Sequence, residues 1–191
     1  MTLANRITIM RILLIPFFVM EVIYYVKTSN EMHRLGAILC FAFASLCDGL
    51  DGYIARKYHQ VSELGTILDP LADKLLLVSG IIVLSFTHGA GFAAIPLWLT
   101  GTILGRDGLV LLGLGVLQLM IGKVTVRPRV LGKIATVLQM VVVLWILLKW
   151  DAKWLTIWIA GAAIGTIGSG LLYLWDWTRQ VSAHPSASPK N

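Results

Sequence analysis

Long apolar runs with few charges alternate with short polar segments along the chain. Residues 75–105 and 154–175 contain no Asp, Glu, Lys or Arg, and shorter uncharged runs lie at 35–47, 108–122 and 134–148. A membrane-spanning helix needs about 20 predominantly apolar residues. The pattern therefore predicts six transmembrane helices, at residues 7–26, 35–56, 66–87, 93–120, 131–149 and 154–176.

The composition agrees with a chain whose solvent is mostly lipid. Of 191 residues, 57% are hydrophobic and 14% are charged, against about 25% charged in an ordinary soluble domain. This excludes a disordered chain, a collagen-like chain and a soluble nucleic-acid-binding domain, because a soluble fold of this length leaves much of its surface facing water. We expect an all-α integral membrane protein with one domain over residues 1–181, followed by a disordered tail at 182–191.

The basic residues predict the orientation of the six helices. With the N-terminus inside, ten of the 16 Lys and Arg side chains fall on the side of the two termini and four on the opposite side, and Lys74 and Arg106 fall within helices. Cytoplasmic loops carry the excess of Lys and Arg in membrane proteins. Both termini are therefore expected in the cytoplasm, and the net charge of +6 favours an anionic membrane surface or a phosphorylated substrate as partner.

Four of the ten acidic residues lie close together in the sequence, at the ends of two consecutive predicted helices: Asp48, Asp51, Asp69 and Asp73. Residues three or four apart share a helix face, so each helix presents one pair of carboxylates. The segment between the helices turns on the cytoplasmic side, which places the two pairs at the same depth.

A divalent-metal site explains this cluster better than a structural role. A single Asp near a helix end is usually a cap or a surface charge, and two could pair with Arg56 or Lys74. Four ionised carboxylates beside hydrocarbon are costly unless cations neutralise them. Carboxylate oxygens are preferred ligands of Mg²⁺ and Mn²⁺, and two such ions about 3.5–4 Å apart form a clamp for phosphoryl chemistry.

The glycines and the Arg around the carboxylates complete a longer pattern, Asp48-x-x-Asp51-Gly52-x-x-Ala55-Arg56-x8-Gly65-x-x-x-Asp69-x-x-x-Asp73. This pattern resembles, position for position, the signature of the CDP-alcohol phosphatidyltransferases, whose six-helix count also fits. The resemblance implies a homodimeric, multi-pass enzyme of phospholipid biosynthesis, in a bacterial inner membrane, with its active site facing the cytoplasm.

The resemblance also implies a role for each residue of the pattern. Asp48, Asp51 and Asp69 would hold one Mg²⁺ or Mn²⁺ ion, and Asp48, Asp69 and Asp73 the second. Asp73 would also be the catalytic base on the acceptor hydroxyl. The CDP part of CDP-diacylglycerol would contact Gly52, Arg56 and Ser62.

Three stretches narrow the acceptor alcohol to two candidates. Residues 3–11, 52–58 and 68–74 are similar to the branch that uses glycerol 3-phosphate, giving phosphatidylglycerophosphate and CMP, and to the related cardiolipin synthases, which use phosphatidylglycerol. These stretches do not separate the two groups. We expect glycerol 3-phosphate, with phosphatidylglycerol as the alternative acceptor.

Two basic residues are candidates for binding that acceptor. Arg106 lies deep in a predicted helix, where burying an Arg costs free energy unless the side chain faces a polar cavity. Arg106 either binds the acceptor or forms an isolated ion pair with Asp107. Lys133 lies in the first turn of the helix predicted at 131–149, directly after Gly132, and this Gly-Lys pair resembles that of the synthases. Alternative explanations for the surrounding basic loop are topology control and contact with anionic lipid.

Two other classes of membrane protein fit the sequence less well. A membrane prenyltransferase would need two separated Asp motifs in a longer chain. A cation channel or transporter would place its acidic sites near the bilayer midplane, often with internal repeats, whereas these Asp residues lie toward one face and no repeat is visible.

Overall fold

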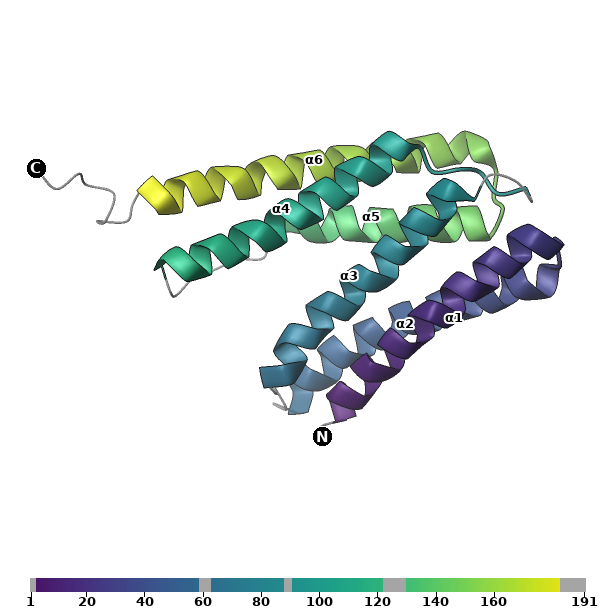
Figure 1. Ribbon diagram of the computed structural model, residues 1–191, viewed down its shortest axis with the longest axis horizontal. Helices are drawn as coiled ribbons and strands as arrows, with labels where there is room; N and C mark the ends of the chain where they lie inside the picture. Colours follow the sequence, from purple (N-terminus) through teal and green to yellow (C-terminus); the bar gives the residue numbers. More distant parts are fainter. Residues whose placement is uncertain (1–2, 59–62, 88–90, 122–129, 183–191) are drawn as a thin grey trace, which may run out of the picture. The chain divides into compact units, whose positions relative to one another are not determined.

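The computed structural model describes the backbone of residues 3–58, 63–87, 91–121 and 130–182, and side chains within 9–47, 74–87, 91–113 and 130–178. These residues form six helices and no strands: α1 (Leu3–Thr28), α2 (Glu31–Tyr58), α3 (Glu63–Phe86), α4 (Leu97–Ile121), α5 (Val130–Leu147) and α6 (Ala152–Ser182). The predicted all-α class and the count of six helices are confirmed (Figure 1). The tail predicted at 182–191 is wrong at its first residue, because Ser182 belongs to α6, and residues 183–191 lie outside the described residues.

Some helix ends differ from the predicted ends for identifiable reasons. The helix predicted at 93–120 begins at Leu97 instead, because Pro96 disfavours helical geometry in the residue before it. The helix predicted from residue 35 begins at Glu31, where the Asn30 side chain accepts a hydrogen bond from the Met32 amide at 3.1 Å and caps the helix. The helix predicted to reach 149 ends at Leu147, since Lys149 is left-handed with φ 54°.

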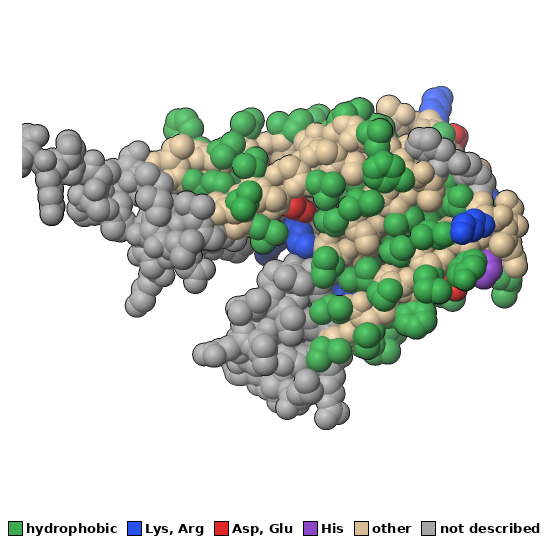
Figure 2. Space-filling model, in the orientation of Figure 1, with side chains coloured by type: hydrophobic (Ala, Val, Ile, Leu, Met, Phe, Trp, Pro, Cys, Tyr) green, Lys and Arg blue, Asp and Glu red, His purple; other side chains and the backbone are tan. Residues whose placement is uncertain are grey.

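Three described stretches are long and apolar enough to cross a membrane: Ile9–Thr28, Val130–Leu147 and Ala152–Thr178. Their exposed side chains suit lipid; in α6, Ile157, Ile164 and Leu171 are each more than half exposed, at 59%, 73% and 62%. Apolar side chains also spread widely over the described surface in Figure 2. The protein is therefore a membrane protein, and a span by each of the other three helices stays a prediction.

The chain divides into two compact units: residues 1–96 with 143–155, and residues 97–142 with 156–191. This division into units does not test the expectation of a single domain over 1–181, which stays a prediction. In the first unit α1 packs against both α2 and α3, and α2 against α3. The three helices run alternately up and down (Figure 1), and two residues, 29–30, separate α1 from α2.

One residue of α1 fixes the register of the first unit. The Phe18 ring lies 5.5 Å from the Phe41 ring of α2, centre to centre, and a Cβ at Gly80 of α3 would lie 3.5 Å from Phe18. Phe18, Phe41 and Gly80 are all buried. Phe18 therefore marks one level at which the three helices meet.

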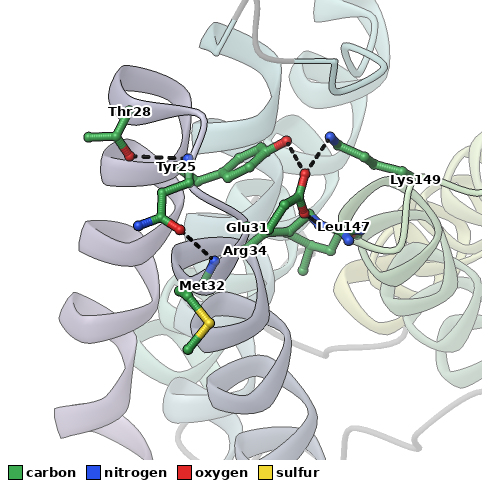
Figure 3. A network of polar contacts seen from close by, with 8 residues as sticks. Tyr25, Thr28, Glu31, Met32, Arg34, Leu147 and Lys149 are labelled. Carbon is green, nitrogen blue, oxygen red and sulfur yellow. Dashed lines mark hydrogen bonds and ion pairs between the residues drawn. The ribbon is translucent and has the colours of Figure 1, made fainter.

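A polar cluster closes the end of the first unit where α1 turns into α2 (Figure 3). The Glu31 carboxylate accepts hydrogen bonds from Lys149 at 3.2 Å, from the Tyr25 hydroxyl at 3.4 Å and from Arg34. Arg34 also donates to the Leu147 carbonyl at 3.3 Å. These contacts join the α1–α2 turn to the connection between α5 and α6.

In the second unit, small residues let α5 and α6 approach closely. A Cβ added at Gly165 would lie 3.3 Å from the Cα of Ala135. The buried Gln139 side chain donates a hydrogen bond to the Thr166 hydroxyl at 2.8 Å. Small residues and interhelical hydrogen bonds are the usual means by which membrane helices associate.

Candidate active site

The four carboxylate positions lie at adjoining ends of α2 and α3. At about 1.5 Å of rise per residue, Asp48 and Asp51 lie about 15 and 10 Å before the end of α2, and Asp69 and Asp73 lie about 9 and 15 Å after the start of α3. The two helices contact each other within the first unit. The backbone therefore places the Asp pair of α2 and the Asp pair of α3 at matching depths. The side chains of these four residues are not among those that the structure describes.

This donor set fits divalent cations. Each helix contributes two carboxylates at a spacing that puts them on one face, and four carboxylates supply oxygen ligands of the kind that Mg²⁺ and Mn²⁺ take. Four negative charges within a membrane helix pair also need counter-cations.

The residues expected to contact CDP belong to the same end of the first unit. Gly52 directly follows Asp51 in α2, and Arg56 lies one turn later, two residues before the helix ends at Tyr58. Their side-chain environment lies outside the described residues, as does Ser62 entirely.

Arg106 is buried in the second unit among three helices. Its side chain is 8% exposed, and its Nη1 lies 2.6 Å from Oδ1 of Asp107. The guanidinium carbon lies 5.6 Å from the centre of the Tyr173 ring on α6. The ion pair with Asp107 is therefore present, while Nε makes no hydrogen bond to any of the described residues.

Gly132 of α5 completes this arrangement, which we call the Arg106 cluster: Arg106, Asp107, Gly132 and Tyr173. A Cβ at position 132 would lie 2.9 Å from Nη2 of Arg106 and 3.3 Å from the Tyr173 hydroxyl. Glycine thus leaves the room that the guanidinium and the phenol occupy. Lys133 follows on α5 with an exposed side chain.

Sequence reasoning missed two residues. Tyr173 lies in an uncharged run and carries no signal of its own, because only the packing of α6 brings it to Arg106. Arg11 of α1 was counted as one of the ten charges on the side of the termini, yet it is 1% exposed and is among the largest fully buried side chains of the described residues. The signal was available: an Arg inside an apolar run indicates a polar surrounding.

Comparison with known proteins identifies the family. Residues 1–166 match the family model described as CDP-alcohol phosphatidyltransferase. This range includes the complete acidic pattern on α2 and α3, Arg106 and Lys133.

Several curated proteins are similar to the chain, and those of Escherichia coli (strain K12), Rickettsia felis and Pseudomonas fluorescens all carry the name CDP-diacylglycerol–glycerol-3-phosphate 3-phosphatidyltransferase. The E. coli protein is 29% identical over 93% of this chain and 91% of its own length. The R. felis protein is 36% identical over 90% of this chain and 80% of its own. The P. fluorescens match is 37% identical, but spans 56% of this chain and about half, 51%, of that protein.

The family model covers most of the chain, and the six helices carry its signature where α2 and α3 adjoin. The chain therefore belongs to the CDP-alcohol phosphatidyltransferase family and is a membrane-bound transferase enzyme.

Proposed function

We propose that this enzyme transfers the phosphatidyl group of CDP-diacylglycerol to sn-glycerol 3-phosphate, giving phosphatidylglycerophosphate and CMP. The observation that carries the proposal is the placement of the acidic pattern at matching depths on α2 and α3. The choice of acceptor is supported by similarity over nine-tenths of the chain to proteins named for this reaction.

In the proposed mechanism Asp48, Asp51 and Asp69 would hold one Mg²⁺ or Mn²⁺ ion, and Asp48, Asp69 and Asp73 would hold a second. When bound, the pair of ions supplies charge stabilisation on the diphosphate and on the leaving CMP. Gly52, Arg56 and Ser62 bind and orient the CDP part of the lipid.

Asp73 acts as the general base in this scheme. It accepts the proton of the acceptor hydroxyl, whose oxygen attacks the β-phosphorus of CDP-diacylglycerol. The new phosphorus–oxygen bond forms as the bond to the CMP oxygen breaks, so one proton leaves the acceptor and CMP leaves the lipid.

The Arg106 cluster supplies a cation suited to the phosphate of the acceptor. Arg106 is held by Tyr173 and Asp107, and its Nε donor is not used by any described residue. A guanidinium that keeps a free donor can bind a phosphate oxygen by a charge-assisted hydrogen bond. We assign Arg106 and Lys133 to acceptor binding, with Arg106 the stronger candidate because its cluster is built from three helices.

The end of the first unit that carries the acidic pattern also indicates how the enzyme is oriented in the membrane. The start of α1, the end of α2 and the start of α3 lie together there (Figure 1), so the catalytic end shares the side of the N-terminus. The excess of Lys and Arg supports a cytoplasmic position for that side, and similarity to bacterial enzymes supports the inner membrane. The family resemblance supports a homodimer.

A panel of acceptors tests the proposal. Purified protein in detergent receives CDP-diacylglycerol, Mg²⁺ or Mn²⁺ and one alcohol at a time, and CMP release is measured. Release with glycerol 3-phosphate but not with phosphatidylglycerol supports the proposal. Release with phosphatidylglycerol alone would instead make the protein a cardiolipin synthase, and no release with any alcohol would overturn the mechanism.

A further inference from the structure

Arg11 is a buried cation that the mechanism above does not use. Its side chain is 1% exposed on a helix that packs against both α2 and α3. An Arg inside a membrane helix bundle is expensive and faces anionic or polar groups. The anionic or polar groups that Arg11 faces must lie in the first unit at the same depth as Arg11 along α1.

The α1–α2 hairpin gives a first answer. α1 ends at Thr28 and α2 begins at Glu31, so Arg11 and Asp48 lie equally far from the turn, at about 26 Å along each helix for a rise of about 1.5 Å per residue. The same counting puts Phe18 level with Phe41, and those two rings are in contact. The register of the hairpin therefore holds where the structure shows it directly.

The spacing around Phe18 extends this argument to α3. Positions seven residues apart lie almost on the same helix face. Phe18 meets Phe41 of α2 and Gly80 of α3. One step of seven toward the catalytic end leads from Phe18 to Arg11, from Phe41 to Asp48 and from Gly80 to Asp73.

The other acids of the first unit with described side chains are engaged elsewhere. Glu21 pairs with His33 at 2.9 Å, and Glu31 pairs with Arg34 and Lys149 at the opposite end. Asp151 accepts a hydrogen bond from the Lys153 amide at the start of α6, at 3.0 Å. The acidic pattern thus provides the carboxylates nearest to the level of Arg11.

We propose that Arg11 is a positioning residue, which pairs with Asp48 and Asp73 and fixes these carboxylates in the orientation that binds the metal ions. The proposal rests on the proposed function, because it takes the carboxylates as metal ligands. Groups that orient metal ligands from outside typically change metal affinity by about 10–100-fold when removed. A guanidinium is suited to this role because its planar fork can hold carboxylates in a fixed geometry.

The test measures Mn²⁺ binding to the purified, metal-free enzyme without substrate. The concentration of free Mn²⁺ is read from its electron paramagnetic resonance signal. Arg11→Gln should weaken Mn²⁺ binding about 10–100-fold. Arg11→Lys should bind Mn²⁺ more tightly than Arg11→Gln but less tightly than the wild type, because Lys keeps the positive charge and lacks the planar guanidinium. If Arg11→Gln does not fold, Arg11→Lys is the variant that tests the proposal. Thermal unfolding without metal checks that each variant is folded.

Arg34→Gln is the matched control. It removes one positive charge from the same unit at the opposite end, where Arg34 pairs with Glu31, and should leave Mn²⁺ binding unchanged. Unchanged or tighter Mn²⁺ binding in folded Arg11→Gln or Arg11→Lys would overturn the role of Arg11 alone. Wild-type enzyme that binds no Mn²⁺ would overturn the metal site, and the role of Arg11 with it.

Discussion

The guanidinium of Arg106 on α4 lies 5.6 Å from the centre of the Tyr173 ring on α6. The two residues are 67 positions apart in the chain, and Gly132 of α5 leaves the space in which both fit. The second unit thereby holds a buried cation, to which the proposed function assigns the binding of the anionic acceptor.

Gly132→Ala should raise the KM for glycerol 3-phosphate about tenfold, because a misplacement near 1 Å in a binding group can cost up to about a hundredfold. The new Cβ would lie 2.9 Å from Nη2 of Arg106, and the end of that side chain must move. Steady-state kinetics with varied acceptor measures the effect. The matched control is Gly161→Ala on α6, where a Cβ would meet Leu138 at an ordinary 3.6 Å; an equal rise in both variants would contradict the interpretation.

Arg106→Gln should lower both stability and activity, because it breaks a buried ion pair with Asp107 at a cost of about 3–5 kcal/mol. Arg106→Gln combined with Asp107→Asn should recover most of the stability, since the buried negative charge is also removed. Activity should stay low in the double variant if Arg106 binds the acceptor. Unfolding midpoints and CMP release separate the two effects, and recovery of both would make the pair purely structural.

The cluster at the α1–α2 turn should stabilise the protein over a defined pH window. Its hydrogen bond from Arg34, and next the contact with Lys149, hold the pKa of Glu31 below the ordinary 4.5. Contact with Tyr25, and next with Glu31, raises the pKa of Lys149 above the ordinary 10.5. The Glu31 contribution is present above about pH 4.5 and is lost as the pH falls through its lowered pKa; the Lys149 contribution is present below about pH 10.5 and is lost as the pH rises through its raised pKa.

Glu31→Gln tests that window by thermal unfolding in detergent. The variant should unfold at a slightly lower temperature than the wild type at pH 7, since exposed ion pairs contribute little. The difference should shrink below pH 4 and in high salt. A difference that persists unchanged at low pH would mean that the carboxylate charge is not responsible.

The sequence predicts the helices well where they are long and uncharged. The uncharged run at 154–175 lies within α6. The uncharged run at 75–105 covers the end of α3 and the start of α4, and α4 begins later than predicted because Pro96 directly precedes it. Asp48 and Asp73 were singled out by their spacing to Asp51 and Asp69, because residues three or four apart share a helix face whatever the tertiary structure, and their roles stay a prediction. The partners of Arg106 could not be found in this way, since Tyr173 and Gly132 reach it only through packing between helices.

Asp73 carries the central chemical step in this account, so Asp73→Asn tests it most directly. CMP release from CDP-diacylglycerol with glycerol 3-phosphate and Mg²⁺ is measured for wild type and for the variant, with Mn²⁺ binding and thermal unfolding measured on the same samples. We expect turnover with the wild type and a loss of about 10²–10⁴-fold with Asp73→Asn, as for removal of a general base, in a protein that is still folded. Full turnover by Asp73→Asn would contradict the account.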